Sequence, residues 1–295
     1  MSQKDSQAMN NAESILERVR SVVSQVDGWL GARRLKIHVQ PYTKAYYKHL
    51  QKGWRRSAKQ IVPEILELIQ PKHVIDVGCG VGIWLSVFKE CGVENIWGVD
   101  GDYVDKKMLQ IPEERFLSLD LKKPFRMDRQ FDLVVSLEVA EHLPSECAET
   151  FVDSLTRLGP VILFSAAIPL QGGTHHINEQ WPDYWAKYFQ EKGYVVIDCI
   201  RKKIWQNDNV RWFYAQNILM FVRQGYLESH PLLKREFESS DTSQLSIVHP
   251  KALSNMSLRR ALSMLPIVTK KALERRMKRA LRRLLDFGQI TRNVK

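Results

Sequence analysis

Two short stretches of the sequence carry side chains that could take part in acid–base chemistry. Glu138, Glu141 and His142 are three and four residues apart, so one helical turn could bring all three to the same face. His175 and His176 stand in a second stretch, GGTHHINEQW, whose glycine pair would let the chain close over a ligand. An imidazole there has a pKa suited to a general base near neutral pH. The alternative is that both histidines are ordinary surface or structural residues.

A third stretch, residues 74–84 (VIDVGCGVGIW), could bind a ligand through its backbone. An apolar run leads into closely spaced glycines and then into helix-compatible residues, which predicts a buried strand, a tight turn and a helix. The next apolar run, NIWGV, ends in Asp100, whose carboxylate could accept both hydroxyls of a ribose. A dinucleotide fingerprint would need glycine at Ile83, and no phosphate-binding Lys-Ser or Lys-Thr follows the turn. The pattern therefore favours a nucleoside ligand without a pyrophosphate.

These stretches must be positioned by strands that alternate with helices. Such alternation predicts an α/β fold with a doubly wound, mostly parallel, seven-stranded sheet. The last two strands have no helical pattern between them and are expected to form an antiparallel edge hairpin. Strands are expected near 73–77, 95–99, 115–119, 131–136, 160–167, 194–201 and 216–223, and helices over 81–91, over 145–158 and from residue 181.

The order VIDVGCGVGIW, GVD, SLDL, FDLVVSLEVAEHL resembles the class I S-adenosylmethionine-dependent methyltransferases, from about residue 46 to residue 223. The resemblance implies a Rossmann-like methyltransferase fold and S-adenosyl-L-methionine as cofactor. The resemblance assigns the methionine part to Gly78 and Gly80, its ammonium to Asp76, the ribose to Asp100, and the adenine to Asp120 and the backbone of Leu121. The alternative for Asp100 and Asp120 is that they only cap strand ends.

The string from Glu138 to His142 also resembles the E-x-x-E-H signature of metal-assisted ubiquinone O-methyltransferases and small-RNA 2′-O-methyltransferases. These families are reported to add a histidine or polar ligand from the loop after the fifth strand, where this chain has GTHH. Glu138, Glu141 and His142 would then bind Mg²⁺ or Mn²⁺, which could acidify a substrate hydroxyl. In the alternative without a metal, Glu138 faces the cofactor pocket, while Glu141 and His142 brace their loop.

The chain divides by composition into four parts. Residues 1–40 form a helical extension, and residues 41–225 form the catalytic domain, whose first helix could cover the cofactor as a lid. Residues 226–250 are polar and indicate a linker. Residues 251–295 contain 13 basic and two acidic residues, whereas the rest of the chain holds 31 of each, so the net charge of +11 lies entirely in this amphipathic, helix-compatible tail.

Partners and location follow from the same counts. The basic tail could lie on an anionic membrane, dock to a partner protein or contact nucleic acid, and the neutral balance elsewhere disfavours the last. The four cysteines form no C-x-x-C pair, and no run of 18 apolar residues occurs. We therefore expect a cytoplasmic protein, peripheral at the inner face of a membrane if the tail binds lipid.

The sequence favours O-methylation of a hydroxyl on a small molecule, glycan or lipid-linked acceptor. One alternative is 2′-O-methylation of a nucleic acid, and another is a non-catalytic scaffold that binds the cofactor and is recruited through its tail. Arg211, Gln216 and Asn217 are further polar candidates, in a segment dense in aromatic residues that could wall an acceptor pocket.

Overall fold

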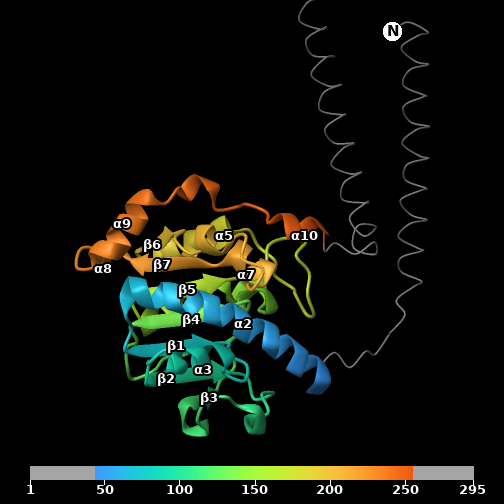
Figure 1. Cartoon of the computed structure of the whole chain (residues 1–295). Helices are drawn as coiled ribbons and strands as arrows, with labels where there is room; N and C mark the ends of the chain where they lie inside the picture. Colours follow the sequence, from blue (N-terminus) through green and yellow to red (C-terminus); the bar gives the residue numbers. More distant parts are fainter. Residues whose placement is uncertain (1–43, 255–295) are drawn as a thin grey trace, which may run out of the picture. The chain divides into compact units, whose positions relative to one another are not determined.

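The computed structural model describes residues 44–254, which build one seven-stranded sheet with helices on both faces (Figure 1). The strand order is β3-β2-β1-β4-β5-β7-β6. The first five strands pair in parallel, whereas β7 runs antiparallel to both of its neighbours. The predicted doubly wound α/β sheet is confirmed. The strands are β1 (His73–Val77), β2 (Asn95–Asp100), β3 (Phe116–Ser118), β4 (Leu133–Leu137), β5 (Val161–Ser165), β6 (Tyr194–Ile197) and β7 (Leu219–Arg223).

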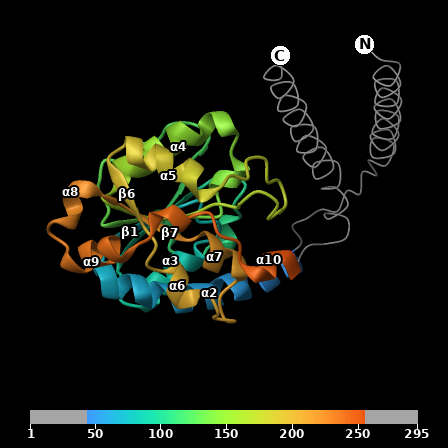
Figure 2. The same ribbon diagram turned by 90° about the horizontal axis from the view of Figure 1, so that it is seen from above.

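Two apolar layers sandwich the sheet, because alternate strand residues point to opposite faces. Val74 and Leu133 join one buried cluster, while their neighbours Ile75 and Val134 join the other. Figure 2 shows α2, α3 and α6 on one side of the sheet and α4 and α5 on the other. These helices are α2 (Lys44–Ile69), α3 (Ile83–Glu90), α4 (Ala148–Leu158), α5 (Pro182–Glu191) and α6 (Arg201–Ile204).

Helix α2 lies along the sheet as part of the first layer. Ile61 and Ile65 are fully buried, and the Arg55 guanidinium donates to Ser86 Oγ of α3 at 3.0 Å. The backbone N–H of Arg211 donates to Ser57 Oγ at 3.0 Å, which fastens the helix to the connection between β6 and β7. Residues 55–65 of this helix therefore pack against the domain, and the role of the helix as a lid over the cofactor stays a prediction. The expected extension over residues 1–40 lies outside the described residues.

Residues 226–250 fold onto the domain, in contrast to the polar linker expected there. Leu227 and Leu233 are buried in the first apolar cluster. Arg201, which is 1% exposed, forms a two-pronged ion pair with Asp198 at 2.7 and 2.8 Å and donates to the Leu245 carbonyl at 2.8 Å. The segment buries only a few apolar residues, and the hydrogen bond from the buried Arg201 to the Leu245 carbonyl adds a further attachment of its backbone to the domain. The segment contains the end of α8 (Gln224–Leu227), all of α9 (Pro231–Ser239) and the start of α10 (Pro250–Ser254).

The antiparallel direction of β7 matters for the site. Its first residue, Leu219, pairs with Phe164 near the carboxyl end of β5. The residues before β7 therefore lie at the edge where the parallel strands end. They form helix α7 (Trp212–Asn217), which, together with α6, occupies a connection that was expected to lack helices.

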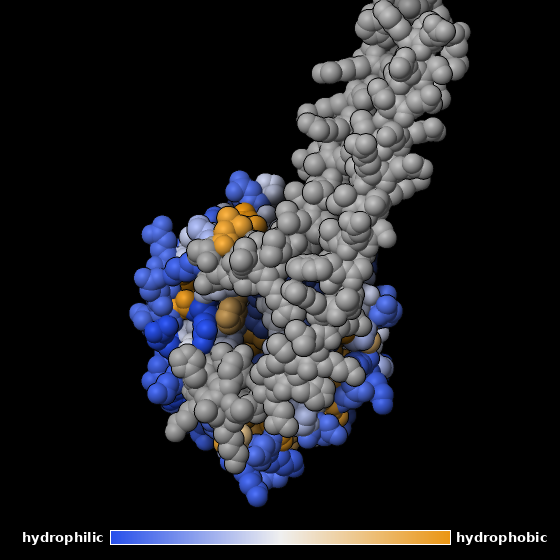
Figure 3. All heavy atoms as spheres, turned by 90° about the vertical axis from the view of Figure 1, so that its right-hand side faces the viewer, coloured by the Kyte–Doolittle hydropathy of each residue, from blue (hydrophilic) through white to orange (hydrophobic). Residues whose placement is uncertain are grey.

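The described surface on the side seen in Figure 3 is mostly hydrophilic, with apolar side chains in small spots. Three of the large apolar side chains exposed in the described part of the chain, Leu170, Ile177 and Trp181, lie in or directly after the loop that follows β5.

Candidate functional site

The turn between β1 and α3 is shaped by glycines in left-handed backbone conformations. Gly78, Gly80 and Gly82 have φ values of 86°, 53° and 80°, a region that side chains disfavour. A Cβ atom on Gly78 would lie 2.3 Å from Cγ2 of Val139. The Gly78 and Cys79 N–H groups donate to the Val99 carbonyl at 2.7 and 3.1 Å, so the turn is fixed to β2.

Asp100, at the end of β2, closes this turn from the other side. Its carboxylate is 4% exposed and accepts from the N–H groups of Gly80 at 2.6 Å and Gly101 at 2.7 Å and from the hydroxyl of Tyr103. Asp76 is buried nearby, and burial together with the charge of Asp100 raises its pKa well above the usual value. A cationic ligand group at the turn would relieve this crowding of acidic groups.

Asp120 and Leu121 follow β3 at the same edge of the sheet. Asp120 is exposed, and its Oδ1 accepts from the Lys122 N–H at 3.1 Å in a local turn. Leu121 is buried in the second apolar cluster. The Leu119 N–H donates to the Asp100 carbonyl at 2.8 Å, which ties this segment to the end of β2. The observed contacts of Asp120 are those of a turn cap, so its adenine role stays a prediction.

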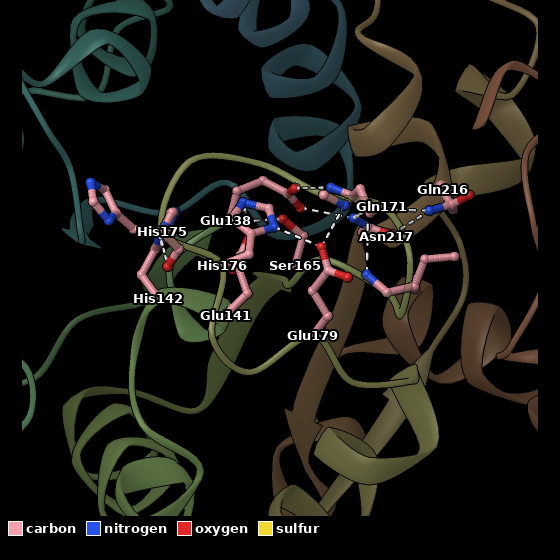
Figure 4. A network of polar contacts seen from close by, with 12 residues as sticks. Glu138, Glu141, His142, Ser165, Gln171, His175, His176, Glu179, Gln216 and Asn217 are labelled. Atoms are coloured by element: carbon pink, nitrogen blue, oxygen red, sulfur yellow. Dashed lines mark hydrogen bonds and ion pairs between the residues drawn. The ribbon is translucent and has the colours of Figure 1, made fainter. Parts of the chain in front are cut away.

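Glu138, the residue after β4, is held by side-chain amides on its carboxylate (Figure 4). Its two oxygens accept from Gln171 Nε2 at 2.7 Å and Asn217 Nδ2 at 3.0 Å. Its N–H donates to the carbonyl and hydroxyl oxygens of Ser165, and its φ of 58° is left-handed. Burial raises the pKa of Glu138, and the donors Asn217, Ser165 and Gln171 oppose that rise. The carboxylate is therefore well satisfied by the protein itself.

Glu141 has the opposite environment. It is fully buried, and neither carboxylate oxygen has a hydrogen-bond partner among the residues that the structure describes. Burial, followed by repulsion from Glu138, raises its pKa well above the usual value. An unpartnered buried carboxylate is unfavourable unless it binds a proton or a cation.

Two imidazoles surround this carboxylate. Possible ligand atoms of Glu141, His142 and His176 lie within 4.8 Å of one another, and His176 Nε2 is 3.9 Å from Glu141 Oε1. The two rings stand nearly perpendicular with centroids 4.9 Å apart. Burial, and then the neighbouring His176, lower the pKa of His142, which favours the neutral form that binds metals. An orphaned carboxylate beside two imidazoles fits a divalent cation.

The adjacent His175 takes part through its backbone. Its side chain is exposed, and its carbonyl lies 3.3 Å from His142 Nδ1. A carbonyl can only accept, so His142 carries its hydrogen on Nδ1 and keeps its lone pair on Nε2. The structure thus brings His176 into the cluster and leaves the His175 ring outside it.

Of the expected group, Glu141 and His142 lie together with His176 from the GTHH loop, whereas Glu138 is not part of this cluster, and the metal role of all of them stays a prediction. Helical spacing does not apply to Glu138, because only Ala140–His142 form a helical turn and Glu138 is left-handed. Sequence reasoning missed Gln171, which binds Glu138. It lies in a polar loop where no spacing distinguished it.

No curated protein matches the chain. The methyltransferase domain of bacterial CtHen1 is 21% identical, with 57% of this chain and 96% of that chain covered and a TM-score of 0.42. Magnesium protoporphyrin IX methyltransferase from Synechocystis PCC 6803 with bound SAH is 18% identical, with 70% of this chain and 100% of that chain covered and a TM-score of 0.45. CalS10, an amino pentose methyltransferase from Micromonospora echinaspora with bound SAM, is 13% identical, with 62% of this chain and 98% of that chain covered and a TM-score of 0.44.

Residues 46–199, just over half of the chain, match the family model described as a methyltransferase domain. This stretch spans the glycine turn, Asp100 and the cluster of Glu141, His142 and His176. The resemblance seen in the sequence is confirmed, and the chain belongs to the methyltransferase domain family, as a class I enzyme that uses S-adenosylmethionine.

Proposed function

We propose that this enzyme methylates a hydroxyl group on a small molecule, glycan or lipid-linked acceptor. The observation that carries the proposal is the cluster of Glu141, His142 and His176, at the edge of the sheet that also holds the glycine turn. The hydroxyl oxygen attacks the sulfonium methyl carbon, the carbon–sulfur bond breaks, and S-adenosylhomocysteine leaves. The hydroxyl proton must be removed during the reaction, and imidazoles near neutral pH are suited to accept it.

The cofactor is proposed to lie along the ends of β1, β2 and β3. Gly78 and Gly80 would pass its methionine part, and Asp76 would hold the ammonium. Asp100 would accept the ribose hydroxyls, for which it exchanges the Tyr103 hydroxyl seen on its carboxylate. Asp120 and the Leu121 N–H would contact the adenine, and Glu138 would face the cofactor pocket with its carboxylate fixed by the amide donors.

We further propose that Glu141, His142 and His176 hold a divalent cation, Mg²⁺ or Mn²⁺. Such an ion would lower the pKa of an acceptor hydroxyl. Glu141 would supply the charge, because its buried carboxylate lacks a hydrogen-bond partner among the described residues. His142 and His176 would each offer Nε2. Without a cation, His176 Nε2 is the group placed to accept the hydroxyl proton, and the His175 ring is the weaker candidate because it is exposed.

The test is transfer of labelled methyl from S-adenosylmethionine into a metabolite extract that contains sugars, phenols and lipid-linked glycans. We expect label in an alkali-stable ether. Methyl transfer should be lost after the enzyme is treated with a chelator, and Mg²⁺ or Mn²⁺ should restore it. Glu141→Gln should abolish the metal response, whereas the exposed Glu146→Gln should retain it. Full transfer by chelated enzyme would exclude the metal, and label found only in amines or carboxyl esters would exclude O-methylation of a hydroxyl.

Two rival functions predict other outcomes of the same experiment. Label in RNA would indicate a 2′-O-methyltransferase, which the neutral charge balance of residues 1–250 disfavours. Cofactor binding without transfer to any fraction would indicate a scaffold.

The basic tail, residues 251–295, is proposed to contact an anionic membrane surface or a partner protein. It lies mostly outside the described residues, and its charge is the support. Within residues 44–254 no helix is both long and apolar enough to cross a bilayer. Flotation with anionic liposomes should require the tail, so equal flotation of a chain truncated after residue 250 would exclude the membrane role.

A further inference from the structure

One carboxylate crosslinks the loop between β5 and α5. Glu179 Oε2 accepts from the Leu170 N–H at 2.7 Å, and Glu179 Oε1 accepts from the Gly172 N–H. The same Oε1 lies 3.0 Å from His176 Nδ1. Three points of the loop thus meet on a single side chain, which Figure 4 shows beside the Glu138 network.

This contact selects one form of the His176 ring. A carboxylate can only accept, so Nδ1 carries the hydrogen and the lone pair is on Nε2. That atom is the one 3.9 Å from Glu141 Oε1. An outer carboxylate that receives one ring N–H of a histidine fixes both its tautomer and its orientation toward a ligand on the other side.

The absence of a side chain at Gly173 leaves room for the His176 ring. A Cβ atom on Gly173 would lie 2.1 Å from His176 Nε2 and 2.5 Å from Cε1. The ring is only 12% exposed. Two separate features, the Glu179 carboxylate and the bare Gly173 backbone, therefore hold His176 in one place.

The same carboxylate stabilises an unfavourable turn. Leu170 and His175 have φ values of 74° and 61°, a conformation that residues with side chains disfavour. The hydrogen bonds from Leu170 and Gly172 to Glu179 flank Gln171, which reaches Glu138. Glu179 thus supports both contacts of the loop with the site.

We propose that Glu179 is a positioning residue, which sets the tautomer and place of His176 and the turn that carries Gln171. It acts through His176 and does not itself touch the acceptor. The inference deepens the proposed function, on which its catalytic meaning rests, but the arrangement itself can be tested without metal or acceptor.

The experiment records long-range ¹⁵N NMR of the histidine rings and amide hydrogen exchange in metal-free protein. Glu179→Gln replaces one acceptor oxygen by an NH₂ group, so it must lose either the Leu170 bond or the bonds at Oε1. Expected is a His176 population protonated on Nε2, or at least tenfold faster exchange at Leu170 or Gly172. Glu191→Gln on α5, a half-exposed glutamate near Lys187, is the matched control and should change neither.

Gly173→Ala tests the second constraint with Glu179 intact, and it should move the His176 ring signals. Both variants should unfold in urea in one cooperative transition, as wild type does, which shows that they fold. An unchanged His176 tautomer together with unchanged exchange in Glu179→Gln would overturn the inference.

Mn²⁺ titration calorimetry then separates this inference from the proposed function. Glu179→Gln should bind Mn²⁺ about 10–100-fold more weakly than wild type. If wild type binds no Mn²⁺ but the tautomer still changes in Glu179→Gln, the metal proposal fails and the positioning role stands.

Discussion

The turn after β1 and the loop after β5 both lie at the carboxyl edge of the sheet, and different kinds of contact hold each of them in place. The turn after β1 uses glycines in left-handed conformations and backbone hydrogen bonds to Val99. The loop after β5 uses side chains, with Glu179 crossing it and Gln171 reaching Glu138. It also places residues with side chains, Leu170 and His175, in the left-handed region. The first loop depends mainly on its glycines, whereas the second depends on particular side chains together with the bare backbone of Gly173.

Under the proposed function, this difference matches two tasks, which are holding the cofactor and recognising the acceptor. A cofactor shared by a whole family can be held by backbone groups, which do not depend on residue identity except where glycine is required. An acceptor differs between enzymes and must be read by side chains. Among the described residues, three of the four non-glycine residues with positive φ, Glu138, Leu170 and His175, lie in the loop after β5 or in contact with it, and the surrounding hydrogen bonds keep them in place.

The largest effect should come from Gly78→Ala, which breaks the backbone-built turn. The new Cβ would meet Val139 at 2.3 Å in a left-handed conformation, so we expect a loss of about 3 kcal/mol in unfolding free energy. Gly92→Ala is the control, since its φ is 95° but nothing lies within 4 Å, and it should lose about 1 kcal/mol. Urea denaturation measures both, and equal losses would contradict the steric argument.

Asp100→Ala tests the side chain on which the turn depends. We expect S-adenosylmethionine affinity to fall by about 2 kcal/mol, roughly thirtyfold, because ribose hydroxyls and the Gly80 N–H lose their acceptor. Calorimetry measures the affinity. Asp105→Ala, an exposed cap of the neighbouring turn, should bind normally. Unchanged affinity in Asp100→Ala would exclude the ribose role.

Asn217→Ala tests the side-chain clamp. It removes a donor from Glu138 Oε1 and from Gln171 Oε1, so buried oxygens lose a partner, at a cost of about 1.5 kcal/mol in unfolding free energy. The exposed Asn209→Ala should be within experimental error of wild type. If Glu138→Gln added in the same chain restores none of the loss, the carboxylate is not the group that needs Asn217.

The smallest effect is expected from Asp76→Asn. Burial, and then Asp100, raise the pKa of Asp76 in the folded protein, so the folded state holds this proton to higher pH than the unfolded chain. The stability that the protonated Asp76 contributes is full below the pKa of this residue in the unfolded chain. It is lost as pH rises through the pKa of Asp76 in the folded protein. Asparagine should therefore stabilise cofactor-free protein by about 1 kcal/mol at pH 8 and by less near pH 4.

Denaturation from pH 4 to pH 8 measures this difference, and the exposed Asp128→Asn is the control. A gain that does not shrink toward low pH would contradict the assigned cause. The same variant should bind S-adenosylmethionine more weakly, if Asp76 holds the ammonium.

The sequence by itself determined the glycine turn and the strands beside it. Strand, glycine turn and helix are contiguous between residues 73 and 90, and Asp100 ends the next strand, so local spacing carried the geometry. The sheet followed because alternating strands and helices leave few ways to bury both faces. The packing of residues 226–250 was not predicted from the sequence, because they are attached to the domain through Arg201, which lies far from them in the chain and forms a buried ion pair with Asp198.

Only the tertiary structure decided which residues surround Glu138 and Glu141. Glu138 meets Gln171 and Asn217 across 33 and 79 residues, and the antiparallel β7 is what brings Asn217 to this edge. Whether Glu138 or His176 joins Glu141 and His142 depended on one left-handed residue and one folded loop. Local periodicity contains neither, because both arise from contacts between segments that are far apart in the chain.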